Sequence, residues 1–309
     1  MRTTLKISEI ITEWLETMDV LEITRKNYKR KIELWFRWLS GNKIDLRSAT
    51  TKHVVAYKDH LIATHHSLFT ANGYMVVIKL FYKYCERKRY CDNIAQGVRS
   101  GFRMTGKNKL PLSMEQAREL LNRVDVSTIK GKRDKLAIAL MLFNGLRTCE
   151  VERINIEDIT TRENVPVLYL QRKGKLDKND MVVLHPKAME YFEDYISVRE
   201  FDVREPLFIS HRDCDKGQVV RLSRQAVARM VKKRLRAMGI NDRKYSAHSL
   251  RHTFGSLLIE QDVDMEDVRE LMGHSSTMVT KIYVELVQQR KMLHCSPAAK
   301  MIDKLVACS

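Results

Sequence analysis

The chain has 309 residues, of which 44% are hydrophobic and 30% charged, a balance that is typical of a folded protein and excludes a wholly disordered one. Its 55 lysines and arginines outnumber its 38 aspartates and glutamates, and the net charge of +17 favours a polyanionic partner such as nucleic acid. We find no apolar run that could cross a bilayer and no signal peptide, so we expect a cytoplasmic protein that contacts no membrane. The six cysteines lack zinc-site spacing and fit a reducing compartment.

Helical periodicity dominates the first domain, which we place at residues 1–98. It predicts helices over about residues 7–18, 24–39, 52–64 and 69–87. Aromatic residues on the second and fourth helices are expected in the core. The second helix is also rich in lysine and arginine. Such a helix is more often a solvated surface than a DNA-reading one, but the charge of the whole chain leads us to predict DNA contacts from Arg25, Lys26 and Lys29.

Residues 99–110 are polar, basic and carry two glycines, without apolar periodicity. This composition predicts an interdomain linker. Its lysines, including Lys107 and Lys109, are suited to lie along a phosphate backbone.

The second domain, residues 111–309, is predicted to be helical with one β-hairpin, so the fold class is mainly α with a small sheet (α+β). Ser113 and Gln116 form a capping box at a helix start, an apolar helix covers 134–143, and β-type runs at 165–171 and 181–184 flank a charged turn. A further helix runs from Ser223 to a stop at Gly239. Its basic residues could fill a major groove; they are Arg224, Arg229, Lys232 and Lys233.

Four short segments of this domain carry chemistry-bearing residues in a fixed order. They read GLRTCE at 145–150, QRKGK at 171–175, HSLRH at 248–252 and LMGHSSTMVTKIY at 271–283. Together they supply arginines, lysines, histidines and a tyrosine, which is the inventory for attack on a phosphodiester by a protein hydroxyl. Each segment alone is a weak signal, whereas the conjunction is difficult to obtain by chance.

The segments resemble the tyrosine recombinase (integrase) family over most of residues 112–285, and the first hundred residues resemble that family's helical core-binding domain more weakly. The resemblance implies two domains that form a C-shaped clamp on DNA. It also implies DNA cleavage through a 3′-phosphotyrosyl intermediate, with no metal, ATP or other cofactor.

By this resemblance Arg147 and Arg251 are the two arginines that bind the phosphate, a role that suits their permanent charge and planar donors. Glu150, three residues after Arg147, would orient it, although such spacing alone is more often a surface salt bridge. His248 and His274 would assist proton transfer or donate to phosphate oxygens. Tyr283 would be the nucleophile; a phenol with a pKa near 10 needs cationic surroundings to act at neutral pH.

Lys173 matches the family's hairpin lysine, which protonates the leaving 5′ oxygen. Lys175 and Lys178 lie close by, and the turn is longer than the family's common form. We favour Lys173 because it precedes the glycine, and Lys175 stays an alternative.

As partners, the family implies a double-stranded recombination site and a homotetramer that spans two such sites and exchanges strands through a Holliday junction. Residues 300–306 can form an amphipathic tail helix that docks onto a neighbouring protomer, or packs on its own domain. An accessory or host DNA-bending factor fits the same scheme.

Two biological roles compete: the integrase of a mobile genetic element and a Xer-type recombinase that resolves chromosome or plasmid dimers. The longer hairpin turn favours the mobile element. A type IB topoisomerase and a non-catalytic DNA-binding accessory protein are weaker alternatives. The predicted tail and two-domain layout disfavour the first, and the complete set of catalytic residue types disfavours the second.

Overall fold

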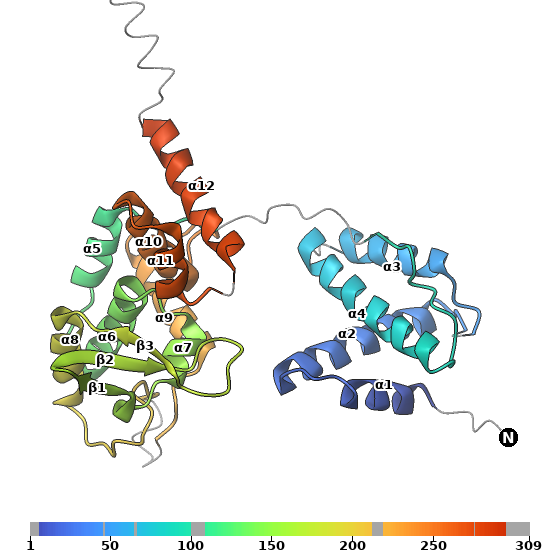
Figure 1. Cartoon of the computed structure of the whole chain (residues 1–309), viewed down its shortest axis with the longest axis horizontal. Coiled ribbons are helices and arrows are strands. Elements are labelled where there is room, and N and C mark those ends of the chain that lie inside the picture. The colour runs from blue at the N-terminus through green and yellow to red at the C-terminus, as the bar shows by residue number, and fades with distance from the viewer. Residues whose placement is uncertain are drawn as a thin grey trace, which may run out of the picture. The chain divides into compact units, whose positions relative to one another are not determined.

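The structure is a computed structural model that describes residues 6–45, 47–64, 67–99, 109–211, 219–274 and 276–294. The chain divides into two compact units, Met1–Gly106 and Lys107–Ser309 (Figure 1). The division falls inside the predicted linker. Lys107 and the predicted tail helix at 300–306 lie outside the described residues. None of the described helices has the length and apolarity needed to span a membrane.

The described part of the first unit contains four helices, as predicted. They are α1 (Ile7–Glu16), α2 (Glu22–Gly41), α3 (Thr51–Ala63) and α4 (Leu68–Arg87). Their ends differ from the predicted ones by at most two residues. The local signals suffice here because each helix has a clear apolar stripe, and because Thr50 and Ser67 occupy the N-cap positions of α3 and α4.

The aromatic residues of the first unit form its core, as expected. The rings of Trp14 and Phe81 meet edge to face with centroids 5.3 Å apart. Trp35 is fully buried, and its indole N–H donates to the Tyr82 hydroxyl at 3.2 Å. These contacts join α1, α2 and α4 and satisfy the polar atoms that burial would otherwise leave unpaired.

The second unit is mainly helical, also as predicted. Its described helices are α5 (Met114–Asn122), α6 (Ile129–Phe143), α7 (Thr148–Arg153), η1 (Ile156–Asp158), α8 (Pro186–Ile196), α9 (Arg224–Ala237), α10 (Ala247–Glu260), α11 (Met265–Met272) and α12 (Thr277–His294). The capping box before α5 is present: the Ser113 hydroxyl accepts from the Gln116 N–H at 3.2 Å, and the Gln116 side chain accepts from the Ser113 N–H at 2.9 Å. Ser223 caps α9 as predicted. Several elements of this unit were not predicted, among them α8, α11 and the first turn of α6.

The sheet has one more strand than the predicted hairpin. Strands β1 (Ile159–Arg162), β2 (Val165–Leu170) and β3 (Asp180–Val183) are antiparallel in the order β1-β2-β3. The hairpin of β2 and β3 is confirmed, and residues 171–179 between them hold the catalytic-lysine candidates. We did not predict β1 because its sequence is short, polar and largely exposed.

The core of the second unit lies around α6, whose residues 136–141 are fully buried. It packs against α8, α9 and α10. Helices α11 and α12 pack on α10 and form a smaller cluster that includes Val268, Met272 and Tyr283. The helix that carries the predicted nucleophile is therefore held by α10 and α11.

Candidate active site

The structure brings the four sequence segments together within the second unit. Arg147 is the N-cap residue of α7, and Lys173 lies in the loop after β2. His248 and Arg251 lie in the first turns of α10. His274 follows α11, and Tyr283 lies on α12.

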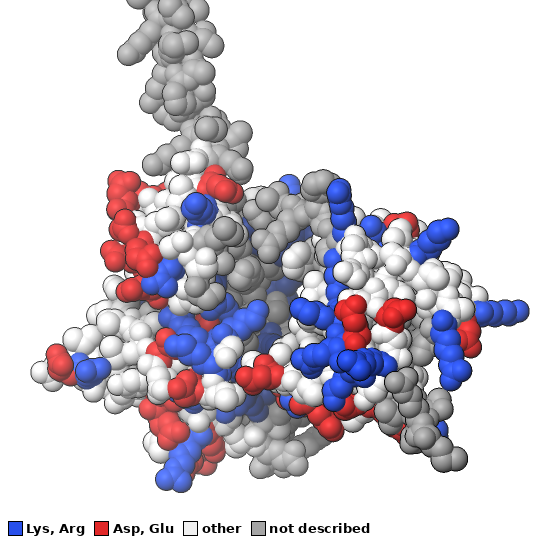
Figure 2. Space-filling model, turned by 45° about the vertical axis from the view of Figure 1, so that its right-hand side comes forward, with Lys and Arg blue, Asp and Glu red and all other residues white. Residues whose placement is uncertain are grey.

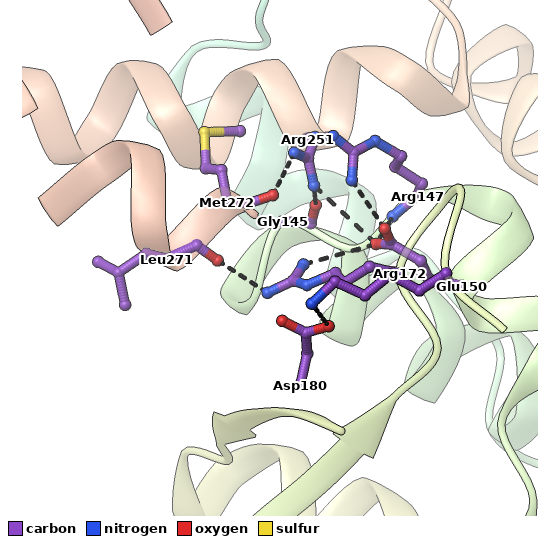
Figure 3. A network of polar contacts seen from close by, with 9 residues as sticks. Gly145, Arg147, Glu150, Arg172, Asp180, Arg251, Leu271 and Met272 are labelled. Atoms are coloured by element: carbon purple, nitrogen blue, oxygen red, sulfur yellow. Dashed lines mark hydrogen bonds and ion pairs between the residues drawn. The ribbon is translucent and has the colours of Figure 1, made fainter. Parts of the chain in front are cut away.

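Glu150 is at the centre of the site (Figure 3). Its Oε1 accepts a hydrogen bond from Arg147 Nη1 at 2.7 Å, and its Oε2 accepts from the Arg147 backbone N–H at 2.9 Å. The carboxylate is buried, with the residue 1% exposed. The pair is therefore a buried one that fixes the Arg147 side chain, and the surface salt bridge that the spacing alone suggested is excluded.

Arg251 approaches Glu150 from α10. Its Nη1 lies 4.0 Å from Glu150 Oε2, and its guanidinium donates to the carbonyl oxygens of Gly145 and Met272. The side chain is 1% exposed. Burial, followed by the charge of Arg147, lowers the pKa of Arg251 to about 10, so the guanidinium stays charged at neutral pH.

A third arginine, Arg172, was not predicted. Its Nη1 lies 3.7 Å from Glu150 Oε2, and its Nη2 donates to the Leu271 carbonyl at 3.2 Å (Figure 3). The sequence held one signal for it. Leu168 and Leu170 are buried on one face of β2, and the period of two along a strand continues that face to Arg172. An arginine at a position that faces the core is a candidate for a buried polar contact.

The charges of this cluster do not cancel. Three guanidiniums surround one carboxylate, which leaves an excess of two positive charges in a largely buried place. A bound phosphodiester would offset part of that excess, and arginine is well matched to phosphate oxygens. Among the described residues no group of three His, Cys, Asp or Glu side chains could hold a metal ion.

The three lysines of the β2–β3 loop differ in their contacts. Lys175 pairs with Asp180 at 2.6 Å, and Lys178 pairs with Asp158. Lys173 is exposed and makes no hydrogen bond or ion pair with a described residue. Its ammonium is close enough to His248 to contribute to lowering the pKa of that ring. The geometry therefore favours Lys173 over Lys175 as the proton donor.

Three histidine rings lie close to Tyr283 or to one another. His252, which was noted in its segment but given no role, has its ring centroid 4.5 Å from that of His248 and 5.3 Å from that of Tyr283. The His274 ring is stacked on Tyr283 at 5.9 Å with an interplanar angle of 2°, and its Nδ1 lies 3.1 Å from the Thr280 hydroxyl.

All three rings are neutral at physiological pH. Desolvation, followed by the charge of Arg251, lowers the pKa of His248 to about 4 and that of His274 to about 3. For His252, desolvation and then His248 lower the pKa to about 3. Neutral rings can accept a proton as well as donate a hydrogen bond.

Tyr283 is buried, with 2% of the residue exposed. Burial raises the pKa of its phenol, whereas the charges of Arg251 and Arg147 lower it. Gly255 of α10 makes room for the ring, since a Cβ there would lie 2.9 Å from Tyr283 Cε1. The two arginines thus supply the positive potential that a phenolate needs, while the packing fixes where the phenol sits.

The DNA-contact candidates on α2 are engaged in ion pairs. Arg25 lies 3.2 Å from Glu22, Lys26 lies 3.9 Å from the same residue, and Lys29 lies 4.0 Å from Glu33. These are exposed pairs one helical turn apart, which are weak and could exchange a carboxylate for a phosphate. Their contact with DNA stays a prediction.

The candidates of the second unit fall into two groups. Lys232 donates to the carbonyls of Asn241, Asp242 and Tyr245, and Lys109 donates to the Arg243 carbonyl, so both ammonium groups are used within the protein. Of the predicted contact residues on α9, Arg224, Arg229 and Lys233 are exposed. Figure 2 shows lysine and arginine side chains gathered on the faces in view, with carboxylates among them.

Comparison with known families assigns the chain. The profile of the phage integrase family matches residues 111–290, and that of the phage integrase N-terminal SAM-like domain matches residues 13–89. The chain belongs to the phage integrase family of tyrosine recombinases.

Individual relatives agree with this assignment. A tyrosine recombinase XerC of Caldanaerobacter subterraneus subsp. tengcongensis is 31% identical over 231 residues, which are 72% of this chain and 61% of that protein. The chain therefore spans less than two thirds of that relative. A tyrosine recombinase XerD of Proteus mirabilis is 26% identical over 287 residues, 91% of this chain and 88% of the relative.

Solved structures share the fold. A XerH recombinase in a post-cleavage complex with difH DNA has a TM-score of 0.72 at 21% identity, covering 94% of this chain and 84% of that one. The Tn1549 transposon integrase in complex with a circular-intermediate DNA has a TM-score of 0.70 at 14% identity, covering 91% and 95%. At such identities the likeness concerns the fold alone.

Proposed function

We propose that this protein is a site-specific recombinase that cuts and rejoins double-stranded DNA through Tyr283. The observation that carries the proposal is the Glu150-centred arginine cluster beside a buried tyrosine, with a lysine on the adjoining loop that pairs with no described residue. Family membership supports the same chemistry. The roles below are part of this proposal.

Arg147 and Arg251 bind the two non-bridging oxygens of the scissile phosphate. Glu150 fixes one guanidinium, and two backbone carbonyls fix the other, so little reorganisation is needed in the transition state. His274, oriented by Thr280, donates a further hydrogen bond from its other ring nitrogen.

In the cleavage step the Tyr283 oxygen attacks phosphorus, the new 3′-phosphotyrosyl bond forms and the bond from phosphorus to the 5′ oxygen breaks. Lys173 donates the proton that the leaving oxygen takes up. The phenol proton passes to the neutral ring of His252 and then through His248 to bulk water; the lowered pKa values of these rings mean that they relay the proton and do not hold it. The ester keeps the bond energy, so the 5′ hydroxyl of a second DNA can reverse the step without ATP.

Tyr283 needs access to DNA for this reaction, and it is 2% exposed. The ring therefore has to leave its stack on His274 when DNA binds. Binding of the scissile phosphate favours this movement, because the phosphate offsets part of the excess positive charge of the arginines and offers the phenol an electrophile.

For the biological role we propose the integrase of a mobile genetic element. The long β2–β3 loop supports it, and the fold, which this chain shares with both the Tn1549 transposon integrase and the XerH recombinase, is compatible with it. The alternative is Xer-type dimer resolution, which the XerC and XerD relatives support. In either role the proposed partner is duplex DNA bound by a homotetramer across two sites, with tail exchange between protomers and an accessory DNA-bending factor.

A two-site recombination assay tests the function and its alternatives together. Supercoiled plasmids would carry two copies of the ends of the element that encodes the protein, two chromosomal dimer-resolution sites, or no site. We expect deletion or inversion between two element ends. Recombination at the dimer-resolution site alone would establish the Xer-type role. Relaxation of the plasmid without a site would establish a topoisomerase, and DNA binding without any strand breakage would establish an accessory protein.

A further inference from the structure

Arg172 has no role in the reaction described above, yet it joins three parts of the site. Its backbone belongs to the loop that carries Lys173, and its side chain reaches Glu150 and the Leu271 carbonyl. We propose that Arg172 is a positioning residue that holds the base of this loop, and thereby places the Lys173 ammonium at the leaving 5′ oxygen. The inference rests on the proposed recombinase function.

The first support is the enclosure of the side chain. It is 6% exposed, and its Nε and Nη1 groups have no hydrogen-bond partner within the described residues. Burying a cation with unused donors costs folding free energy. Desolvation by burial also lowers the pKa of Arg172. If this position served only the stability of the fold, an apolar side chain of similar volume would fill it at a lower cost in free energy than a buried arginine.

The second support is the close approach of the turn before α12. Gly273 ends α11 with φ at +58°, and a Cβ on it would lie 2.7 Å from Arg172 Nε and 2.9 Å from its Cζ. The backbone of that turn thus lies directly against the guanidinium. His274, which stacks on Tyr283, is the next residue. Arg172 therefore connects the lysine loop to the segment that leads into the nucleophile helix.

The third support is the direction of neighbouring side chains. Arg172 is buried, whereas Lys173, the next residue, is exposed in the turn that follows, so the two side chains lie on different sides of the chain. The loop has a second internal tie, because the Gln171 side chain donates to the Lys175 and Leu176 carbonyls at 3.0 Å each. These contacts order the loop beyond Lys173, whereas Arg172 connects it to the rest of the site.

The test separates positioning of the proton donor from other roles. Arg172→Ala and Arg172→Lys would be assayed on a nicked duplex that traps the covalent complex, once with the ordinary phosphate and once with a 5′-bridging phosphorothiolate. The sulfur leaving group departs without a proton, so it restores a reaction that lacks its general acid. The duplex carries the site found in the two-site assay.

We expect both variants to form the covalent complex about 100-fold more slowly with the ordinary phosphate, since a misplacement of about 1 Å can cost that much. With the phosphorothiolate they should come within about threefold of the wild type, as Lys173→Ala should. A loss that persists on the phosphorothiolate would overturn the inference. So would an Arg172→Lys variant of normal rate, because charge alone would then suffice.

Arg221→Ala is the matched control. Arg221 is another arginine with a burial-lowered pKa; it donates to the Glu152 and Ile154 carbonyls and to the Asn155 side chain, and has no hydrogen bond or ion pair with Glu150 or with a described residue of the Lys173 loop. Its loss should lower stability without any selective rescue by sulfur; an equal rescue would show a general effect and overturn the inference. If Arg172→Ala does not fold, Arg172→Lys carries the test. A wild type that forms no complex on either substrate would instead refute the proposed function.

Discussion

Substitution of Glu150 by glutamine removes one charge from the centre of the site and changes the shape of the side chain little. The carboxylate is buried and faces three guanidiniums, with its oxygens 2.7 Å from Arg147, 3.7 Å from Arg172 and 4.0 Å from Arg251. The carbonyl oxygen of glutamine can still accept a hydrogen bond from one guanidinium. Its NH₂ group, however, would face the N–H groups of another guanidinium, and two donors cannot form a hydrogen bond. Three like charges would then remain without a counter-charge.

The expected loss follows from the exposure of the partners. Removing one member of a buried ion pair costs about 3–5 kcal/mol, because the remaining charge is left desolvated. Arg147 is 20% exposed and water can screen it in part, whereas Arg172 and Arg251 are 6% and 1% exposed. We therefore expect the free energy of unfolding to fall by about 3 kcal/mol, near the lower end of that range. The covalent-complex rate should fall by about 100-fold or more, as when a transition-state donor is lost.

Urea denaturation measures this loss with an internal control. The tryptophans of the chain are Trp14, Trp35 and Trp38, all in the first unit, so their fluorescence reports that unit alone. Far-ultraviolet circular dichroism reports both units. The dichroism transition of the second unit should move while the fluorescence transition does not. Glu152→Gln on the same helix should change the unfolding free energy by less than about 0.5 kcal/mol. A change below about 1 kcal/mol in Glu150→Gln would refute the reasoning.

The other predictions concern the packing of the nucleophile, the neutral histidines and the choice of lysine. Gly255→Ala should lower the free energy of unfolding by about 1–3 kcal/mol, measured by urea denaturation, because its Cβ would lie 2.9 Å from Tyr283 Cε1; an unchanged value would mean that the ring moves freely. The pKa of His252 is lowered from 6.5 to about 3, so the unfolded chain takes up a proton that the folded chain refuses as pH falls below 6.5. At pH 5 this linkage lowers the free energy of unfolding by about 2 kcal/mol. Urea denaturation at pH 5 and pH 7.5 should show a difference in unfolding free energy that is about 2 kcal/mol smaller for His252→Asn than for the wild type. Lys175→Ala should cleave nicked DNA within about threefold of the wild type, because the ammonium of Lys175 is already paired with Asp180, whereas Lys173→Ala should be about 100-fold slower; the reverse order would exchange their roles.

Features that depend on residues close together in the sequence could be predicted, whereas features that depend on residues far apart in the sequence could not. The helices of the first unit follow from apolar stripes and caps, which are local. Strand β1 has no such signal, because Ile159–Arg162 is polar and is recognisable only by its pairing with β2. Helix α8 was missed although Pro186 at its start and the buried Tyr195 near its end are ordinary helix features.

The site shows the same difference between local features, which could be predicted, and contacts between distant residues, which could not. Residue types, order and resemblance led us to predict Arg147, Arg251 and Tyr283 as site residues, and the structure places them close together; their roles stay predictions. The burial of Glu150 could not be predicted, because it depends on Arg251, about a hundred residues further along the chain. Arg172 was overlooked for a related reason: its contact with the Leu271 carbonyl spans a similar separation, and only the alternation of β2 hinted at it.

Mapping of the covalent linkage tests the central claim most directly. The protein would be incubated with a nicked duplex that carries the recombination site, and the trapped complex would be digested and analysed by mass spectrometry. We predict a single adduct on Tyr283, and for Tyr283→Phe no adduct with DNA affinity within about twofold of the wild type. An adduct on another residue, or tight DNA binding with no adduct at all on a site that recombines in the two-site assay, would contradict the account.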